Sequence, residues 1–111
     1  MNTLVHDTPL DNIFAALANQ KRRSIVHDLS LSPSTVGQLA RNYDLTLPAI
    51  HKHIRTLESA NLIIRKKSGR TNFVALNNST LGLAKSWLTQ YQTEWGNVDA
   101  SLENYIARMQ E

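Results

Sequence analysis

The most informative absence from this sequence of 111 residues is cysteine, which occurs nowhere in the chain. Without thiols there is no disulfide, thiolate metal site, cysteine nucleophile or thiol redox sensor. Long apolar runs are also missing, because no stretch approaches the roughly 18 residues that a membrane span needs. The first dozen residues lack the basic cluster and apolar block of a secretory signal. We therefore expect a cytoplasmic protein that does not contact a membrane.

Catalytic and cofactor-binding motifs are absent as well. The sequence contains no glycine-rich phosphate loop and no pair of metal ligands at helical spacing. Two of the histidines lie only two residues apart on a predicted helix, so their side chains diverge by about 200° and cannot hold one ion together. We expect no enzymatic activity, no cofactor and no metal site. The histidines of the chain are His6, His27, His51 and His53.

The charge of the chain is concentrated in its middle third. With 41% apolar and 19% charged residues, the composition is that of a single soluble domain. Residues 41–70 hold seven basic and two acidic side chains, whereas residues 71–111 hold two basic and four acidic ones. Such asymmetry indicates a polyanion-binding face, although a charge cluster is also the ordinary make-up of a solvated surface.

Apolar spacing and capping residues predict four helices in the first 60 residues. The first helix is predicted to begin at a capping box, with Thr8 as the cap and Pro9 at the first helical position. Asn19 is the predicted cap of the second helix, and the third begins at Ser34 or Thr35.

The fourth predicted helix combines an apolar stripe with an outer face of different character. Thr46 is its predicted cap, and Asn61, which tolerates a left-handed backbone, is its predicted end. Strands are predicted at residues 62–67 and 71–76, joined by the turn Ser68-Gly69-Arg70. The apolar stripe of the helix consists of Leu47, Ile50, Ile54 and Leu57.

The order of these elements is typical of a winged helix-turn-helix: a helix, a short turn, a second helix and a basic hairpin. In this fold the helix after the turn, here the fourth predicted helix, enters the DNA major groove, and the hairpin lies along the DNA backbone. The candidates for DNA contact on the predicted recognition helix are Thr46, Pro48, Ala49, His51, Lys52, His53, Arg55 and Thr56. The candidates in the predicted wing are Arg65, Lys66, Lys67, Ser68, Gly69 and Arg70.

The two histidines of the predicted recognition helix have two interpretations. Each flanks the apolar stripe, so His51 and His53 either pack or hydrogen-bond locally, or contact phosphates or bases. If their protonation contributes to binding, DNA affinity weakens as the pH rises through roughly 6 to 7.

The last third of the chain has the most regular apolar pattern. Its apolar residues alternate spacings of four and three, which is a heptad seam. A single helix from Thr80 to Gln110 would be about 45 Å long, whereas a domain of this size has a radius of gyration of only roughly 13 Å. Dimerisation is the natural way to cover this seam, and the alternative is a break at Gly96-Asn97 that folds the second half back. The seam consists of Ala84, Leu88, Tyr91, Trp95, Val98, Leu102, Tyr105 and Met109.

Residues Leu10 to Leu76 resemble the ArsR-type winged helix-turn-helix repressors, through the segments LANQKRRSIVHDL, TVGQLARNYDLT, AIHKHIRTLESANLI and RKKSGRTNFVAL. The resemblance implies a dimer formed through the first and last helices, which adds Leu10 and Phe14 to the interface. It also implies imperfectly palindromic operator DNA as the target and favours a DNA contact for His53, which occupies the family's histidine position.

The sequence departs from the pattern of this family in three places. His51 stands where many members have serine, Leu47-Pro48-Ala49 replace a more polar first turn, and Asn61 replaces the usual glycine. The residues that form the familiar metal sites of the family are also absent from this chain, because it has no cysteine and no histidine beyond His53.

We therefore predict a mainly α protein with a small β-hairpin, in the order α-α-α-α-β-β-α. Within a single domain, residues 8–78 form the DNA-binding core and residues 79–111 form a long C-terminal dimerisation helix. The predicted function is that of a homodimeric, sequence-specific regulator of transcription that binds a pseudopalindromic operator in double-stranded DNA. Repression is favoured over activation. The alternatives are a winged helix for protein interaction or for RNA binding. A small organic effector, a protein effector and no effector all remain open.

Overall fold

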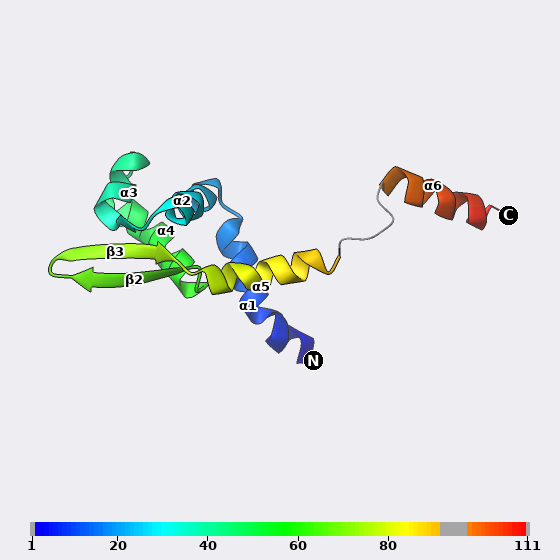
Figure 1. The fold of residues 1–111 in the computed structure, drawn as a ribbon, viewed down its shortest axis with the longest axis horizontal. Helices are drawn as coiled ribbons and strands as arrows, with labels where there is room; N and C mark the ends of the chain where they lie inside the picture. Colours follow the sequence, from blue (N-terminus) through cyan, green and yellow to red (C-terminus); the bar gives the residue numbers. More distant parts are fainter. Residues whose placement is uncertain (1, 92–97, 111) are drawn as a thin grey trace.

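A computed structural model describes the backbone of residues 2–91 and 98–110 and the side chains of residues 9–91 and 101–110. Figure 1 shows a helical body from which a two-stranded ribbon projects. None of the described helices is long and apolar enough to cross a membrane. The elements are α1 (Asn2–Leu17), α2 (Gln20–Leu31), β1 (Ser34–Thr35), α3 (Val36–Asn42), α4 (Leu47–Ser59), β2 (Ile63–Ser68), β3 (Thr71–Leu76), α5 (Asn78–Thr89) and α6 (Val98–Met109).

Three helices begin at the capping residues that the sequence predicts. The side chain of Asn19 accepts a hydrogen bond from the Arg22 amide at 3.1 Å at the start of α2. At the start of α3, the Thr35 hydroxyl accepts a hydrogen bond from the Gln38 amide at 3.1 Å. At the start of α4, the Thr46 hydroxyl accepts one from the Ala49 amide at 3.3 Å. Each cap satisfies one of the amides that a helix N-terminus leaves without an intrahelical partner.

The predicted start of the first helix is wrong. The helix α1 begins at Asn2, and Pro9 lies inside it rather than at its first position. A proline within a helix removes one backbone hydrogen bond, which disfavours this arrangement but does not forbid it. The residues from Thr8 onward have the pattern of a capping box, but the helix runs through them.

The helices α3 and α4 end in the same local motif. Asp44 follows α3 with a φ of 52°, and Asn61 follows α4 with a φ of 60°. In each case the next residue, Leu45 or Leu62, donates its amide to a carbonyl five residues earlier, at 2.9 Å and 3.0 Å respectively. This is a Schellman motif, in which a left-handed residue turns the chain and brings the following apolar residue back to the core.

The sheet has three antiparallel strands in the order β1-β3-β2. The predicted hairpin is present, with Ser68 opposite Thr71 and Ile63 opposite Leu76. Gly69 has a φ of +62° at the first central position of the tight turn, where glycine avoids the strain of a left-handed side chain. The two-residue strand β1 pairs with β3 and has no counterpart in the sequence prediction, because so short a segment has no periodicity.

The helices α1, α2, α3, α4 and α5 and the sheet share one hydrophobic core. The apolar stripe of α4 is confirmed at three of its four positions, but Leu47 is 54% exposed. Leu47 is the first residue of α4, and the fully buried side chains begin one turn later. The largest fully buried side chains are Ile13, Ile25, Leu39, Ile50, Ile54, Leu57, Leu62 and Val74.

The prediction of one continuous C-terminal helix is wrong. The helix α5 ends at Thr89, with Gln90 as its C-terminal cap, and a separate helix α6 begins at Val98. Figure 1 shows α6 apart from the helical body. The proposed break at Gly96-Asn97 lies outside the described residues.

Replacement of Asn61 tests the left-handed turn after α4. Its side chain is exposed, so a substitution acts mainly through the backbone. We expect Asn61→Val to lower the free energy of unfolding by about 1–2 kcal/mol, because a side chain in the left-handed region costs this much, whereas Asn61→Gly should leave it unchanged or raise it. Urea unfolding measures both; equal destabilisation by the two changes would contradict the assigned conformation.

Candidate nucleic-acid interface

The pair α3 and α4 is joined by a short turn and braced from two sides. Leu45, in the turn, packs against the core. The hydroxyl of Tyr43, at the end of α3, donates a hydrogen bond to the carboxylate of Asp28 on α2. Burial, together with this hydrogen bond and the nearby negative charge, raises the pKa of Tyr43. The orientation of α3, and of the turn that leads into α4, is therefore fixed by both apolar and polar contacts.

The outer face of α4 presents two cations and several small groups. Pro48, Lys52 and Arg55 are exposed, and Ala49 and Thr56 are half-exposed. The Thr56 hydroxyl donates to the Lys52 carbonyl of its own helix at 3.1 Å. Small residues in the first turns allow close approach to a duplex, and the two cations can reach bases or phosphates.

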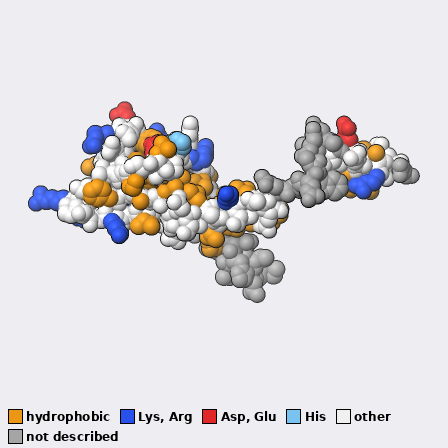
Figure 2. Space-filling view, in the orientation of Figure 1, with side chains coloured by type: hydrophobic (Ala, Val, Ile, Leu, Met, Phe, Trp, Pro, Cys, Tyr) orange, Lys and Arg blue, Asp and Glu red, His pale blue; other side chains and the backbone are white. Residues whose placement is uncertain are grey.

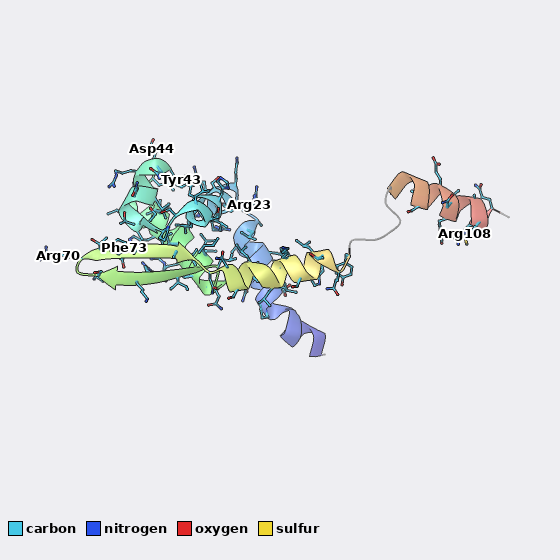
Figure 3. The ribbon with its side chains drawn as sticks, in the orientation of Figure 1. Arg23, Tyr43, Asp44, Arg70, Phe73 and Arg108 are labelled. Atoms are coloured by element: carbon cyan, nitrogen blue, oxygen red, sulfur yellow. The ribbon has the colours of Figure 1, made fainter. Side chains whose placement is uncertain are left out.

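The hairpin adds further cations at the far end of the molecule. Figure 2 shows basic side chains at the end of the ribbon, and Figure 3 places Arg70 at its tip. Lys66, Lys67 and Arg70, as well as Ser68 and Gly69, are exposed. Because side chains alternate along a strand, Lys67 lies on the face that Ile63 buries toward the core and Lys66 lies on the opposite face.

Arg65 differs from the other basic residues of the hairpin, because it is paired. Its Nε and Nη2 donate to the two carboxylate oxygens of Glu58 on α4, at 3.2 Å and 2.6 Å. Its Nη1 also lies 3.4 Å from Nδ1 of His51. Arg65 therefore joins the hairpin to the recognition helix. Among the described residues this is the one ion pair, so the charges of Lys52, Arg55 and the hairpin lysines are not neutralised within the described part of the chain.

On the other flank of α4, Arg22 makes a corresponding contact. Its Nε donates to the Ala16 carbonyl at 2.6 Å, and its Nη2 to the Ala15 carbonyl at 3.4 Å. Its Nη1 lies 3.5 Å from Nδ1 of His53. The two histidines of α4 thus face opposite flanks, as predicted from their spacing, and each approaches a different arginine.

The environment of His53 favours the neutral imidazole. Burial lowers the pKa of His53 below its ordinary value of 6.5, and the positive charges of Arg22, Lys21 and Lys52 lower it further. Of the two interpretations of these histidines, local hydrogen bonding is observed for both. A contact to DNA through a protonated His53 near neutral pH is disfavoured.

The residues of the predicted dimer seam are distributed between the core and the surface. Ala84 is only 6% exposed within its own subunit, where the first turns of α5 pack on the core, so it offers little surface to a partner. Leu10 and Phe14 are half-buried, and Trp95 and the Val98 side chain lie outside the described residues. The remaining seam residues are exposed, namely Leu88, Tyr91, Leu102, Tyr105 and Met109.

Aromatic side chains continue this exposed surface. The ring of Trp87 packs edge-on against Phe14 and Tyr91, with centroids 5.7 Å and 4.9 Å apart. The face of α5 that buries Thr80 and Ala84 therefore extends beyond the core as an apolar, aromatic strip. We call Phe14, Trp87, Leu88 and Tyr91 the aromatic strip.

Sequence reasoning missed the two arginine contacts that flank α4. The apolar pattern predicts no polar contact for Arg22, and the sequence indicates Arg65 only as a cation of the wing. No spacing rule connects α2 with α4, or α4 with a strand beyond a turn, so the sequence holds no signal for either contact. Among the described residues there is no group of three or more histidine, aspartate or glutamate side chains placed to hold a metal.

The fold and the cationic face define a winged helix-turn-helix protein, and comparisons with known proteins agree. A family described as a helix-turn-helix domain matches residues 17–65. The HTH-type transcriptional regulator Rv2034 of Mycobacterium tuberculosis is 31% identical over 83 residues, which cover 75% of this chain and 78% of that protein. The transcriptional repressor SdpR of Bacillus subtilis is 25% identical over 88 residues, 79% of this chain and 98% of the relative.

Solved structures give the family. The crystal structure of an ArsR family transcriptional regulator is 37% identical to this chain, covers 78% of it and 90% of its own length, and superposes with a TM-score of 0.72. An ArsR-like regulator from Rhodococcus sp. RHA1 has the same fold, with a TM-score of 0.70, 24% identity and coverage of 95% and 96%. The chain belongs to the ArsR family of winged helix-turn-helix transcriptional regulators. It is a DNA-binding regulator of transcription, not an enzyme.

The lowered pKa of His53 predicts a pH-dependent stability. Below pH 6.5 the unfolded chain binds a proton that the folded chain resists, so stability should fall as the pH drops from 6.5 toward the folded-state pKa. We expect His53→Gln to reduce the loss in unfolding free energy between pH 7.5 and pH 5.5. The exposed His27, replaced by Gln, is the control; an equal effect of both changes on urea midpoints would contradict the lowered pKa.

Proposed function

We propose that the chain binds a pseudopalindromic operator as a homodimer and acts as a repressor in the cytoplasm. The observation that carries the proposal is the outer face of α4, which is exposed, contains cations with no ion-pair partner among the described side chains, and is held in place by a buried inner face. In winged helix-turn-helix proteins this helix enters the major groove. Repression follows if the dimer occupies promoter DNA, and the name of the Bacillus subtilis relative supports this.

The cations divide into two groups with different roles. Lys52 and Arg55, on α4, lie where base edges are read, whereas Lys66, Lys67 and Arg70, on the hairpin, lie where phosphates pass. Phosphate neutralisation releases counterions, so affinity should fall steeply as salt increases. Arg65 belongs to neither group, since Glu58 neutralises it, and we assign it to positioning the hairpin.

The aromatic strip supports the homodimer. It consists of large apolar groups exposed together, with Leu88 55% and Tyr91 61% exposed. Contiguous apolar surface of this kind marks an interaction site. A two-fold axis through α1 and α5 would place two copies of α4 in successive major grooves, about 34 Å apart.

Alanine substitutions separate the two groups of cations. We expect Lys52→Ala and Arg55→Ala each to weaken binding to a selected operator by about 1–3 kcal/mol, the range for one side chain that reads a base, and to affect random duplex less. Lys66→Ala and Arg70→Ala should weaken both alike and reduce the salt slope by about 1. Fluorescence anisotropy over a salt series measures this. Lys85→Ala on α5 removes the same charge as a control, and equal effects of all the changes would contradict the division.

Light scattering after gel filtration tests the homodimer. We expect the intact chain to have twice its monomer mass at micromolar concentration, and Leu88→Glu with Tyr91→Glu to shift it to monomer, because the interface would bury unpaired carboxylates. Ser86→Glu is the control, since Ser86 is exposed on the opposite face of α5. A monomeric wild-type chain would refute the dimer.

A further inference from the structure

The contact between Arg22 and His53 connects three helices. Arg22 lies at the start of α2, and its guanidinium donates to two carbonyls in the last turn of α1 while it approaches the imidazole of His53 on α4. The last carbonyls of a helix lack intrahelical partners and have partial negative charge, so they attract and orient a cation. The guanidinium is thus fixed by α1 before it meets the recognition helix.

The chemistry of this contact determines which nitrogen of His53 is protonated. A guanidinium has only donors, so Nδ1 of His53 must act as the acceptor and cannot itself bear a hydrogen. A neutral imidazole with an unprotonated Nδ1 bears its hydrogen on Nε2. Burial opposes a second proton on the ring, and the neighbouring positive charges oppose it further. The two ring nitrogens point in different directions, which leaves the Nε2–H available to another partner.

We propose that Arg22 is a positioning residue for DNA recognition, which holds His53 as the neutral Nε2–H tautomer so that α4 offers a single hydrogen-bond donor to an acceptor on DNA. The acceptor is a phosphate oxygen or a purine N7 or O6, and amino groups of bases are disfavoured because the imidazole then presents no acceptor. This inference rests on the proposed role of α4 in reading DNA.

Arg23 provides a matched control. It is the neighbouring residue on α2, and its Nη1 donates to the Leu17 carbonyl at 2.8 Å, also at the end of α1. Its side chain is exposed, and Figure 3 places it on α2, away from the hairpin. Arg22→Met and Arg23→Met remove the same charge and the same kind of carbonyl contact, but only the first removes the contact with His53.

Nitrogen-15 NMR of the free, full-length chain tests the tautomer without DNA. We expect the wild-type His53 ring to show the Nε2–H tautomer and a pKa below 6.5. In Arg22→Met the pKa should rise and the two tautomers should mix, whereas Arg23→Met should leave the ring unchanged. An Nδ1–H tautomer in the wild type, or the same spectrum in Arg22→Met, would overturn the inference whether or not the chain binds DNA.

Binding to a duplex recovered by selection from a random library, and to a scrambled duplex of equal composition, tests the donor. We expect Arg22→Met to lose roughly three- to ten-fold more affinity than Arg23→Met, the range expected for a single hydrogen bond. A loss on both duplexes assigns a phosphate acceptor, and a loss on the selected duplex alone assigns a base. Equal losses in the two variants on both duplexes would overturn the inference.

Substitutions of His53 and a charge-preserving change of Arg22 complete the test. His53→Gln offers an amide donor and should retain most of the affinity, whereas His53→Leu should lose as much affinity as Arg22→Met. The double variant that combines Arg22→Met with His53→Leu should lose no more affinity than either single variant. Arg22→Lys keeps the charge but cannot span carbonyl and imidazole together, so it should weaken binding without changing the salt slope. Additive losses in the double variant, or full affinity in His53→Leu, would refute the role of His53.

Discussion

Burial of one face of α4 sets the orientation of the recognition helix in the fold. Ile50, Ile54 and Leu57 are each fully buried, and side chains of this size contribute about 1.5–3 kcal/mol each when removed from water. Because successive residues of a helix are rotated by 100°, fixing these three positions also fixes the direction of every other side chain of α4. The exposed cations Lys52 and Arg55 therefore point outward because the apolar face of the helix is packed against the core.

Polar contacts refine this orientation rather than hold the fold together. The side chains of Arg65 and Glu58 are 24% and 30% exposed, and ion pairs that remain in contact with solvent contribute little to stability. Their consequence is geometric: Arg65 fastens the hairpin to one flank of the recognition helix, and Arg22 fastens the end of α1 to the other. A change in the packing of α1 would thus reach the recognition helix directly, and α1 contributes Phe14 to the aromatic strip through which the dimer is proposed to form.

Local rules predicted most of the fold but misplaced the start of α1, and three of the features that they missed have a common cause. The caps Asn19 and Thr46, the left-handed Asn61 and the tight turn at Gly69 were predictable because each depends on a few neighbouring residues. The strand β1, the pairing of Arg65 and the burial of Ala84 depend on segments distant in sequence, which no local pattern encodes. The outward face of α4 was predicted from its periodicity, whereas the arginine contacts on its flanks needed the folded chain.

In the proposed complex, two copies of α4 enter successive major grooves on one face of a duplex. Methylation interference on a duplex recovered by selection tests this geometry, because methylation of guanine N7 blocks the major groove alone. We expect two short clusters of interfering guanines that are related by two-fold symmetry and centred about 10 base pairs, or a multiple of one helical turn, apart. Binding that tolerates guanine methylation throughout the site, or a single cluster without a symmetric partner, would contradict it.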